Sequence, residues 1–418
     1  MPEAYIIDAV RTPRSIGKLG KGALSHMHPQ HLAATVLKAL KERNNLDTAD
    51  VDDVIWGCSA QIGLQGGDMG RMAALDAGYD VKASGVTLDR FCGSGITATN
   101  LAAGQIMSGM EDVVVAGGAE MMSHVNDYSM KVHQAGLALA GGLGTGNKRL
   151  AAKFPQTNQG VAADAIAAKE GISRAELEAF GAESQRRAAR AIAEGRFSRS
   201  LVPVVDDEGN VVLDHDEYPR PDTTEEGLAQ LKPAFAMFHD MPSGAESPTY
   251  KQLITAVYPD LAFEPLHHVG TSSGVVDGAA ALLLASKDYA EKKGWRPRAR
   301  VVATANVGDC PTLMLNAPVP AAKKVLEKAG LTIDQIDVWE VNEAFAVVAE
   351  KFIRDLGLDR TKVNPNGGAI ALGHPIGATG AVLIGTALDE LERSGGRYGL
   401  ITMCAAGGMA PAIIIERL

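Results

Sequence analysis

The sequence predicts an α/β protein made of two similar halves. Short apolar runs of strand length alternate with longer helix-like runs near the N-terminus, and the same alternation returns near the C-terminus. In each half a glycine-rich segment leads into a helix, and an apolar strand that ends in an alanine- and glycine-rich turn follows. We interpret this repetition as an internal duplication, with a crevice between two related sheets.

The individual elements follow the order that an α/β architecture requires. In the first half we expect strands at 4–10, 52–60, 86–91 and 112–120, and helices at 31–45 and 101–109. In the second half we expect strands at 334–342, 398–408 and 411–417, and helices at 346–357 and 380–395.

The middle of the chain differs from both ends. Between about 123 and 273 strand-like runs are few, and prolines and glycines crowd residues 202–248. We therefore expect an inserted, loop-rich domain at 123–274, a first half at 1–122 that is completed by about 275–297, and a second half at 298–418.

One helix is expected inside this insertion, at 173–195. Its apolar side would carry Leu177, Phe180 and Ile192. The opposite side would be basic, and we interpret it as a solvated face in preference to a phosphate site; it carries Arg186, Arg187 and Arg190.

Composition excludes several classes of protein. The chain has 418 residues, enough for more than one core, with 46% hydrophobic and 22% charged residues, as in ordinary globular proteins. A formal net charge of −10 argues against a nucleic-acid partner. We find no apolar stretch long enough to span a membrane and no secretory signal. The four cysteines show no pairing pattern, which suggests a reducing compartment. We therefore expect a cytoplasmic protein.

The segment GVTLDRFCGSGITATN, residues 85–100, places Cys92 between a strand and a glycine-rich helix start. Unpaired N–H groups and the helix dipole at such a place favour a thiolate, so we expect the pKa of Cys92 to lie below its reference value of about 8.5. The alternative is a small buried side chain at a tight turn.

Three further segments favour the reactive interpretation. His374 lies in a glycine-rich segment at 364–380, where it could act as a base, although a core histidine is the alternative. Cys404 and Asn342 each follow an apolar strand. Ligands of α/β sheets bind at strand ends, so these residues could share one site.

Taken together and in this order, these motifs resemble those of the thiolase family over essentially the whole chain. Besides the segments above, the resemblance rests on AVRTP, AGGAEMMS, RPDTTEEGLAQLKPAF, GTSSGVVDGAA, NEAFA and NGGAIALGHPIGATG. It implies the thiolase fold, in which two duplicated halves form a five-layered αβαβα core and the inserted domain binds coenzyme A.

The resemblance also implies catalytic roles. Cys92 takes the place of the nucleophile that becomes acylated, and His374 that of its base. Cys404 takes the place of the second thiol, which exchanges a proton with the acetyl-CoA methyl carbon. One oxyanion site would use His374 and a water held by Asn342, and the other would use the backbone N–H groups of Cys92 and Ala406, where the family more often has glycine.

Substrate contacts follow from the same resemblance. Ser273 should meet the pantetheine arm of coenzyme A, and Arg220 and Phe235 should lie near its nucleotide; ordinary loop polarity is the alternative for Arg220 and Ser273. Acyl-CoA and coenzyme A are then substrates, with no separate cofactor or metal, and a homo-oligomer, dimer or tetramer, is expected. The cluster of His26, His28 and His31 lacks regular ligand spacing, so we do not expect a metal there.

We therefore expect a reversible ping-pong thiolase of fatty-acid or related acyl-CoA degradation. Three alternatives remain. One is a β-ketoacyl synthase-like enzyme, which usually has two histidines, and another is a non-catalytic acyl-CoA or lipid carrier. The third is a thiol redox protein, but the C-x-x-C motif of such proteins is missing here.

The sequence departs from the family at three places, which in the family flank the acyl pocket. They are a longer stretch at 236–268, the run 158–160 and the run 314–318. These departures suggest an acyl group other than acetoacetyl.

Overall fold

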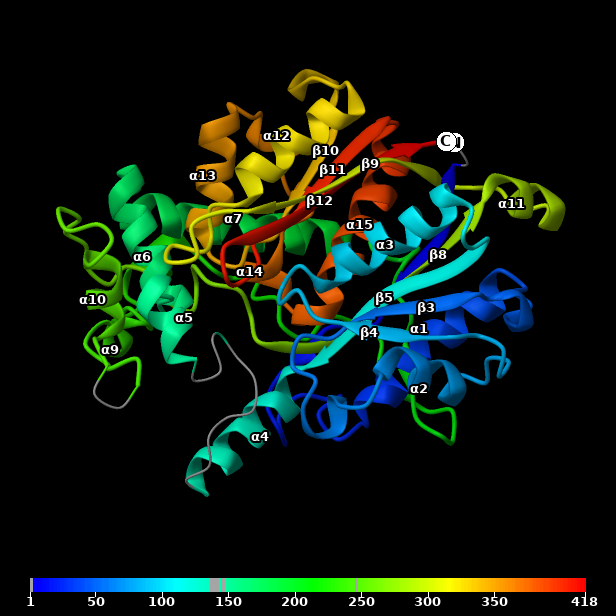
Figure 1. Cartoon of the computed structure of the whole chain (residues 1–418), viewed down its shortest axis with the longest axis horizontal. Coiled ribbons are helices and arrows are strands. Elements are labelled where there is room, and N and C mark those ends of the chain that lie inside the picture. The colour runs from blue at the N-terminus through cyan, green and yellow to red at the C-terminus, as the bar shows by residue number, and fades with distance from the viewer. Residues whose placement is uncertain (1–2, 136–142, 144–146, 245–246) are drawn as a thin grey trace.

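The computed structural model describes residues 3–135, 143, 147–244 and 247–418. Its centre is a ten-stranded sheet that runs through both halves of the chain (Figure 1). The halves join where β1 (Ala4–Arg11) and β9 (Ala299–Gly308) pair over two positions, Tyr5 with Arg300 and Ile6 with Ala299. The predicted α/β class is confirmed.

Both halves have the same strand order. In the first half it is β4-β3-β5-β8-β1, with β3 (Asp53–Gly57), β4 (Val86–Leu88), β5 (Val113–Met121) and β8 (Val276–Ser286). In the second half it is β10-β11-β12-β9, with β10 (Val338–Val341), β11 (Tyr398–Thr402) and β12 (Met409–Arg417). A parallel bridge from Trp339 to Val363 takes the place that β4 has beside β3, so the predicted duplication is present in the topology.

Helices complete five layers (Figure 1). Each half of the chain contributes one half of the ten-stranded sheet. Helices α1 (Pro29–Arg43) and α2 (Met69–Asp76) cover the outer face of the first half-sheet. Helices α12 (Pro318–Ala329) and α13 (Ala346–Leu356) cover the outer face of the second half-sheet. Helices α3 (Ser94–Ser108) and α15 (Ile376–Ser394) lie between the two half-sheets, which gives the expected αβαβα order.

Glycines allow the two central helices to touch. A Cβ on Gly380 would lie 2.1 Å from the backbone nitrogen of Ile96, and one on Gly95 would lie 2.9 Å from that of Ala381. Gly377 packs with its Cα against strand β3, where a Cβ would lie 2.5 Å from the carbonyl oxygen of Gly57. Small residues therefore bring the N-terminal ends of α3 and α15 together.

The segment between β5 and β8 is mostly helical among its described residues. It contains α4 (Met122–Gln134), α5 (Lys148–Lys153), α6 (Gln159–Glu170), α7 (Arg174–Ala193), α8 (Glu225–Ala229), α9 (Ala236–His239), α10 (Tyr250–Thr255) and the hairpin of β6 (Val204–Val205) and β7 (Val211–Leu213). The remaining elements are β2 (Ser15–Ile16), α11 (Lys287–Lys293), α14 (Ala369–Leu372) and short 3-10 turns at 48–50, 63–65, 333–335 and 360–362. No helix in the described part of the chain is long and apolar enough to cross a membrane.

Helix α7 forms where the sequence predicts it, and a capping box of Ser173 and Glu176 fixes its start. The predicted faces need correction. Ile192 is 44% exposed, so it does not share the buried side with Leu177. The guanidinium groups of Arg187 and Arg190 donate to backbone carbonyls of residues 363–365, and these two arginines therefore attach α7 to the second half instead of forming a solvated face.

The AVRTP motif has a structural role. Arg11 makes two hydrogen bonds of 2.8 and 2.9 Å to the carboxylate of Asp216, and both side chains are 2% exposed. The neighbouring Arg14 also contacts this carboxylate, and the two arginines hold the pKa of Asp216 at about 2, against the effect of burial. The ion pairs fix the loop that contains Tyr218 and Arg220 to strand β1.

The contact between the central helices can be tested with two glycine variants. Gly380→Ala would place a methyl group against the backbone of α3, and we expect it to lower the free energy of unfolding by about 1–3 kcal/mol. Gly104 lies in α3, and a methyl group added there would have no atom within 4 Å, so Gly104→Ala should leave stability unchanged or raise it by about 0.4–1 kcal/mol. Urea denaturation measures both, and equal midpoints would contradict the close contact between the helices.

Candidate active site

Cys92 lies at a strained turn just before α3. Phe91 has φ 49°, a conformation that bulky side chains rarely adopt. The Ser94 hydroxyl stabilises the turn, since it accepts from the Arg90 N–H at 2.8 Å and donates to the Phe91 carbonyl at 2.7 Å. The thiol of Cys92 is thereby held at the junction of the two halves, 6% exposed.

His374 lies at the start of the second central helix. Gly373, with φ 92°, turns the chain after α14, and the His374 N–H donates to the carbonyl oxygen of Gly274 at 2.9 Å. Pro375 is the N-cap of α15. His374 is 7% exposed, and it lines the same cavity as Cys92.

A threonine fixes the tautomer of His374. The Thr379 hydroxyl donates to the Pro375 carbonyl at 3.0 Å and lies 2.6 Å from Nδ1 of His374. A hydroxyl has one hydrogen, and because the Thr379 hydroxyl donates it to the carbonyl, we assign the proton of this short contact to Nδ1. Nε2 is then unprotonated, and it accepts from the Asn342 amide at 3.4 Å.

Asn342 and Cys404 each follow a strand, as predicted, and the structure shows that these two strands are parallel neighbours. β10 ends at Val341 and β11 at Thr402, and the Asn342 N–H donates to the Thr402 carbonyl at 3.2 Å. Oδ1 of Asn342 is buried without a hydrogen-bond partner among the described residues. Such an oxygen can accept a hydrogen bond from a bound water or substrate.

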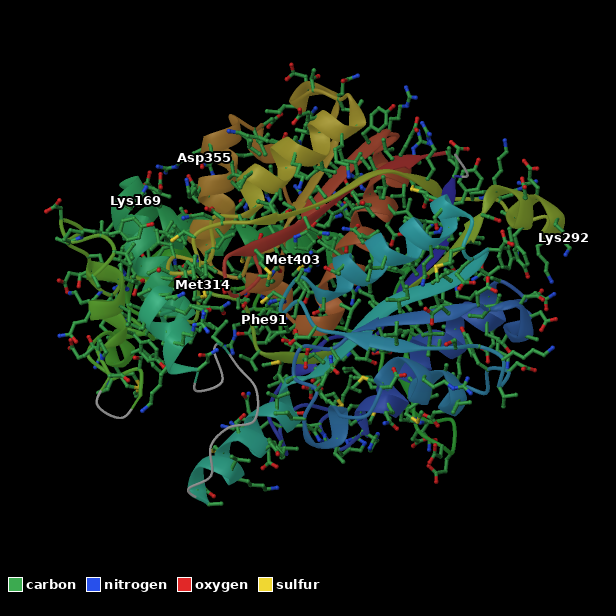
Figure 2. All side chains as sticks on the ribbon, in the orientation of Figure 1. Phe91, Lys169, Lys292, Met314, Asp355 and Met403 are labelled. Atoms are coloured by element: carbon green, nitrogen blue, oxygen red, sulfur yellow. The ribbon has the colours of Figure 1, made fainter. Side chains whose placement is uncertain are left out.

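The two cysteines are close enough for their charges to interact. Burial raises the pKa of the Cys404 thiol, and the nearby Cys92 raises it further. Figure 2 labels Phe91 and Met403, which immediately precede these cysteines, and both lie at the centre of the molecule where the halves meet. The structure therefore brings together Cys92, His374, Asn342 and Cys404.

Burial dominates the electrostatics of the site. It raises the pKa of Cys92 to about 12, although the cysteine's own N–H and the side chain of Gln159 oppose the shift. The expected lowering by the helix terminus is therefore wrong. Burial also lowers the pKa of His374 to about 4. At neutral pH the site contains a thiol beside an uncharged imidazole, so the nucleophile requires a base.

Cys92 lies between two cavities. The first, of about 430 Å³, is lined by His374, Phe235, Ser273 and Tyr218. A third cavity, of about 170 Å³, shares Tyr218 and Val269 with the first and is lined by Arg220. Phe235 thus lines the cavity next to the cysteine, whereas Arg220 lines the third cavity. The second cavity is lined by Ala406 as well as by Cys92.

Two polar residues near the site were not predicted. Glu120 in AGGAEMMS is buried and accepts from the N–H groups of Ser59, Ala60 and Gly377, at 2.9–3.0 Å. It thereby fixes the start of α15 to the end of β5. Glu343, the residue after Asn342, accepts from Ser184 at 2.6 Å and from Asn364 at 3.0 Å. A carboxylate directly after a candidate site residue could have indicated this role.

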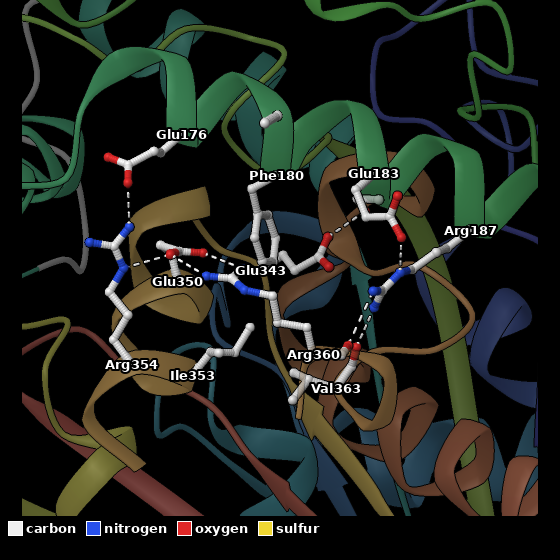
Figure 3. A pocket seen from close by; sticks show the side chains of 12 residues that line it. Glu176, Phe180, Glu183, Arg187, Glu343, Glu350, Ile353, Arg354, Arg360 and Val363 are labelled. Carbon is white, nitrogen blue, oxygen red and sulfur yellow. Dashed lines mark hydrogen bonds and ion pairs between the residues drawn. The ribbon is translucent and has the colours of Figure 1, made fainter. Parts of the chain in front are cut away.

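A separate cavity lies between α7 and α13 (Figure 3). It measures about 260 Å³ and contains three arginines. Arg354 and Arg360 both bind the carboxylate of Glu350, and Arg187 binds Glu183. Because these cations are already paired, and neither reactive cysteine lines the cavity, we assign it to the fold.

Comparisons with known proteins agree with this geometry. Sequence models of the thiolase N-terminal domain and the thiolase C-terminal domain match residues 4–241 and 295–417. The chain belongs to the thiolase family. The chain is 42% identical to a beta-ketoadipyl-CoA thiolase of Pseudomonas aeruginosa, over 100% of this chain and 99% of that protein.

Other thiolases are similarly related. Identity is 42% with a 3-oxoadipyl-CoA/3-oxo-5,6-dehydrosuberyl-CoA thiolase of Escherichia coli, over the full length of both chains. It is 41% with the steroid 3-ketoacyl-CoA thiolase FadA6 of Mycobacterium tuberculosis, over 100% of this chain and 95% of that one. This thiolase is thus an acyltransferase, and the family prediction is confirmed.

The buried state of Cys92 predicts how its alkylation depends on pH. With a pKa of about 12, the thiolate fraction should rise about tenfold per pH unit between pH 7 and 9, without a plateau. Peptide mass spectrometry after timed iodoacetamide exposure measures this rate. A plateau near neutral pH would contradict the dominance of burial.

The tautomer of His374 gives a second prediction. Thr379→Val removes the acceptor of the Nδ1 proton, so kcat should fall about tenfold or more, since a positioned base contributes about 10²–10⁴-fold. Thr379→Ser keeps the hydroxyl and should retain activity. Equal activity of both variants, with unchanged pH profiles, would contradict the assignment.

Proposed function

We propose that this thiolase cleaves 3-ketoacyl-CoA through an acyl-Cys92 intermediate. The observation that carries the proposal is the placement of His374, which lines the same cavity as the buried Cys92 thiol and contacts Thr379 through Nδ1, leaving Nε2 beside the Asn342 amide. In the first step Nε2 takes the thiol proton and Sγ attacks the 3-keto carbon. The imidazolium that results can donate from Nε2 to a developing oxyanion.

Cleavage then requires a proton for carbon. As the bond between C2 and C3 breaks, the electron pair passes to C2 of the leaving acetyl-CoA, and the Cys404 thiol protonates it. The acyl group remains on Cys92 as a thioester. The Cys404 thiolate takes the thiol proton of coenzyme A, and the coenzyme A sulfur then attacks this thioester and releases a shortened acyl-CoA. Cys92 leaves as a thiolate, takes the proton back from the His374 imidazolium and is a thiol again.

Stabilisation of the oxyanions has two sources in this proposal. The unpartnered Oδ1 of Asn342 supports the binding of a water beside His374. The backbone N–H groups of Cys92 and Ala406 are the donors for the acyl-enzyme oxygen, and both residues line the second cavity. A methyl group at Ala406 removes no backbone donor, so alanine can replace the glycine that is more frequent there.

We further propose a degradative direction. The names of related thiolases concern ketoadipyl and steroid substrates, and these names support the degradation of such acyl-CoA compounds at least as well as that of fatty acids. The mechanism requires Cys92 and Cys404 as free thiols, which supports a reducing compartment such as the cytoplasm.

The covalent step can be tested by mass spectrometry. Brief exposure to acetyl-CoA should acetylate Cys92, and free coenzyme A should remove the adduct. Cys92→Ser should give no thioester adduct. Cys404→Ser should still form it but should lose thiolysis of acetoacetyl-CoA by about 10²-fold or more, because the proton donor for carbon is missing.

Cys310→Ser is the matched control, because Cys310 contacts Tyr258 and lines neither cavity at Cys92. It should behave as the unmodified protein. An adduct on another cysteine, or none with any acyl-CoA that binds, would overturn the proposed function and favour a carrier.

A further inference from the structure

The two cavities at Cys92 differ in their neighbours. The first shares Tyr218 with the third cavity, where the cation of Arg220 suits the phosphates of coenzyme A. The acyl group, which the proposed function attaches to Cys92, is then left with the second cavity, of about 470 Å³. Its polar lining comes from Ser59, Gln156, Thr157, Asn158, Gln159, Ser243 and Tyr250, and the Gln159 side chain bonds to Cys92.

None of the described residues that line this second cavity is lysine, arginine, histidine, aspartate or glutamate. Among the residues outside the described ranges, Glu246 alone has an ionisable side chain, and it is acidic. Arg90 and Arg149 are near in sequence but do not line the cavity. A carboxylate buried there would find no described cation to pair with.

Several of the polar groups are already used by the fold. The Thr157 hydroxyl donates to the Tyr250 carbonyl at 2.9 Å, and the Ser243 hydroxyl donates to that of Pro248 at 2.9 Å. The side-chain oxygen of Asn158 caps α6. Oε1 of Gln156, in contrast, is buried without a partner among the described residues.

The hydroxyl of Tyr250 makes no hydrogen bond within the described chain. The Thr157 hydroxyl bonds to the backbone carbonyl of Tyr250 and not to its phenol. Gln156 and Tyr250 therefore offer an amide and a phenol, both uncharged, to a ligand. Either group can bind a hydroxyl or carbonyl oxygen. An amide and a phenol are weak substitutes for a cation beside a carboxylate.

The longer stretch at 236–268 supplies part of this lining. It contributes Ser243 and Tyr250, the latter at the start of α10. His239 fixes this stretch to α6, because its Nε2 lies 3.0 Å from the carboxylate of Asp164 and both side chains are buried. The cavity wall is thus held by a buried polar contact and is not a free surface loop.

We propose that the second cavity binds an uncharged acyl chain longer than acetyl that bears a hydroxyl or carbonyl oxygen, and that Gln156 and Tyr250 select it. The volume lies in the range of about 300–1,000 Å³ that holds whole small ligands, far more than an acetyl group needs. An acyl chain that ends in a carboxylate is disfavoured. The ketoadipyl group, which appears in the names of several relatives, is such a chain.

The test compares three six-carbon substrates in thiolysis by the full-length protein. We expect kcat/KM for 6-hydroxy-3-ketohexanoyl-CoA and 3-ketohexanoyl-CoA to exceed that for 3-ketoadipyl-CoA by about tenfold or more. The hydroxy compound should exceed the methyl compound in the unmodified protein. Equal or better turnover of 3-ketoadipyl-CoA would overturn the proposal.

Variants assign the selection to the two residues. Tyr250→Phe should reduce the ratio between the hydroxy and methyl compounds, whereas Tyr289→Phe, whose hydroxyl binds Asp50 and lines neither cavity, should not. Gln156→Arg should raise turnover of 3-ketoadipyl-CoA relative to 3-ketohexanoyl-CoA. An unchanged ratio in both Tyr250→Phe and Gln156→Arg would overturn their role.

Acetoacetyl-CoA thiolysis and the Cys92 adduct separate this proposal from the proposed function. If neither occurs, the enzyme mechanism itself fails. If both occur and the carboxylate-bearing substrate is preferred, only the inference about the acyl chain fails.

Discussion

The site depends on the contact between α3 and α15. Gly95 and Gly380 remove the side chains that would keep these helices apart, since a Cβ at either position would overlap the backbone of the other helix. Cys92 precedes one helix and His374 precedes the other, so the same contact brings the thiol and the imidazole to one place. Packing at the centre of the fold and chemistry at its junction are therefore one geometric constraint.

Burial at this junction decides the charge state of the site. The same desolvation raises the pKa of Cys92 and lowers that of His374, so both groups are neutral at rest. A proton transfer from Cys92 to His374 would convert this neutral pair into an ion pair. The Thr379 contact matters here because it leaves Nε2, and not Nδ1, free to accept that proton.

Much of the fold and the identity of the candidate site could be predicted from the sequence, because motifs at strand ends and helix starts report local backbone geometry. Cys92, His374, Asn342 and Cys404 were found in this way. Long-range contacts leave no such local pattern. The attachment of Arg187 and Arg190 to residues 363–365, and the depth of burial that reverses the pKa shift of Cys92, depend on segments that are distant in the chain.

The same distinction applies to acyl specificity. Cys92 and His374 lie just before the central helices, and Asn342 and Cys404 follow strand ends. Part of the second cavity, in contrast, comes from the stretch at 236–268, which His239 attaches to α6. A wall that His239 and His267 hold to Asp164 of α6 can change its polar lining without moving the helices that position Cys92 and His374. Charge in that wall, more than its shape, separates dicarboxylic from neutral acyl chains, because desolvation of an unpaired carboxylate costs more than the loss of a few methylene contacts can offset. Family membership therefore fixes the reaction, and the wall residues decide which acyl chain undergoes it.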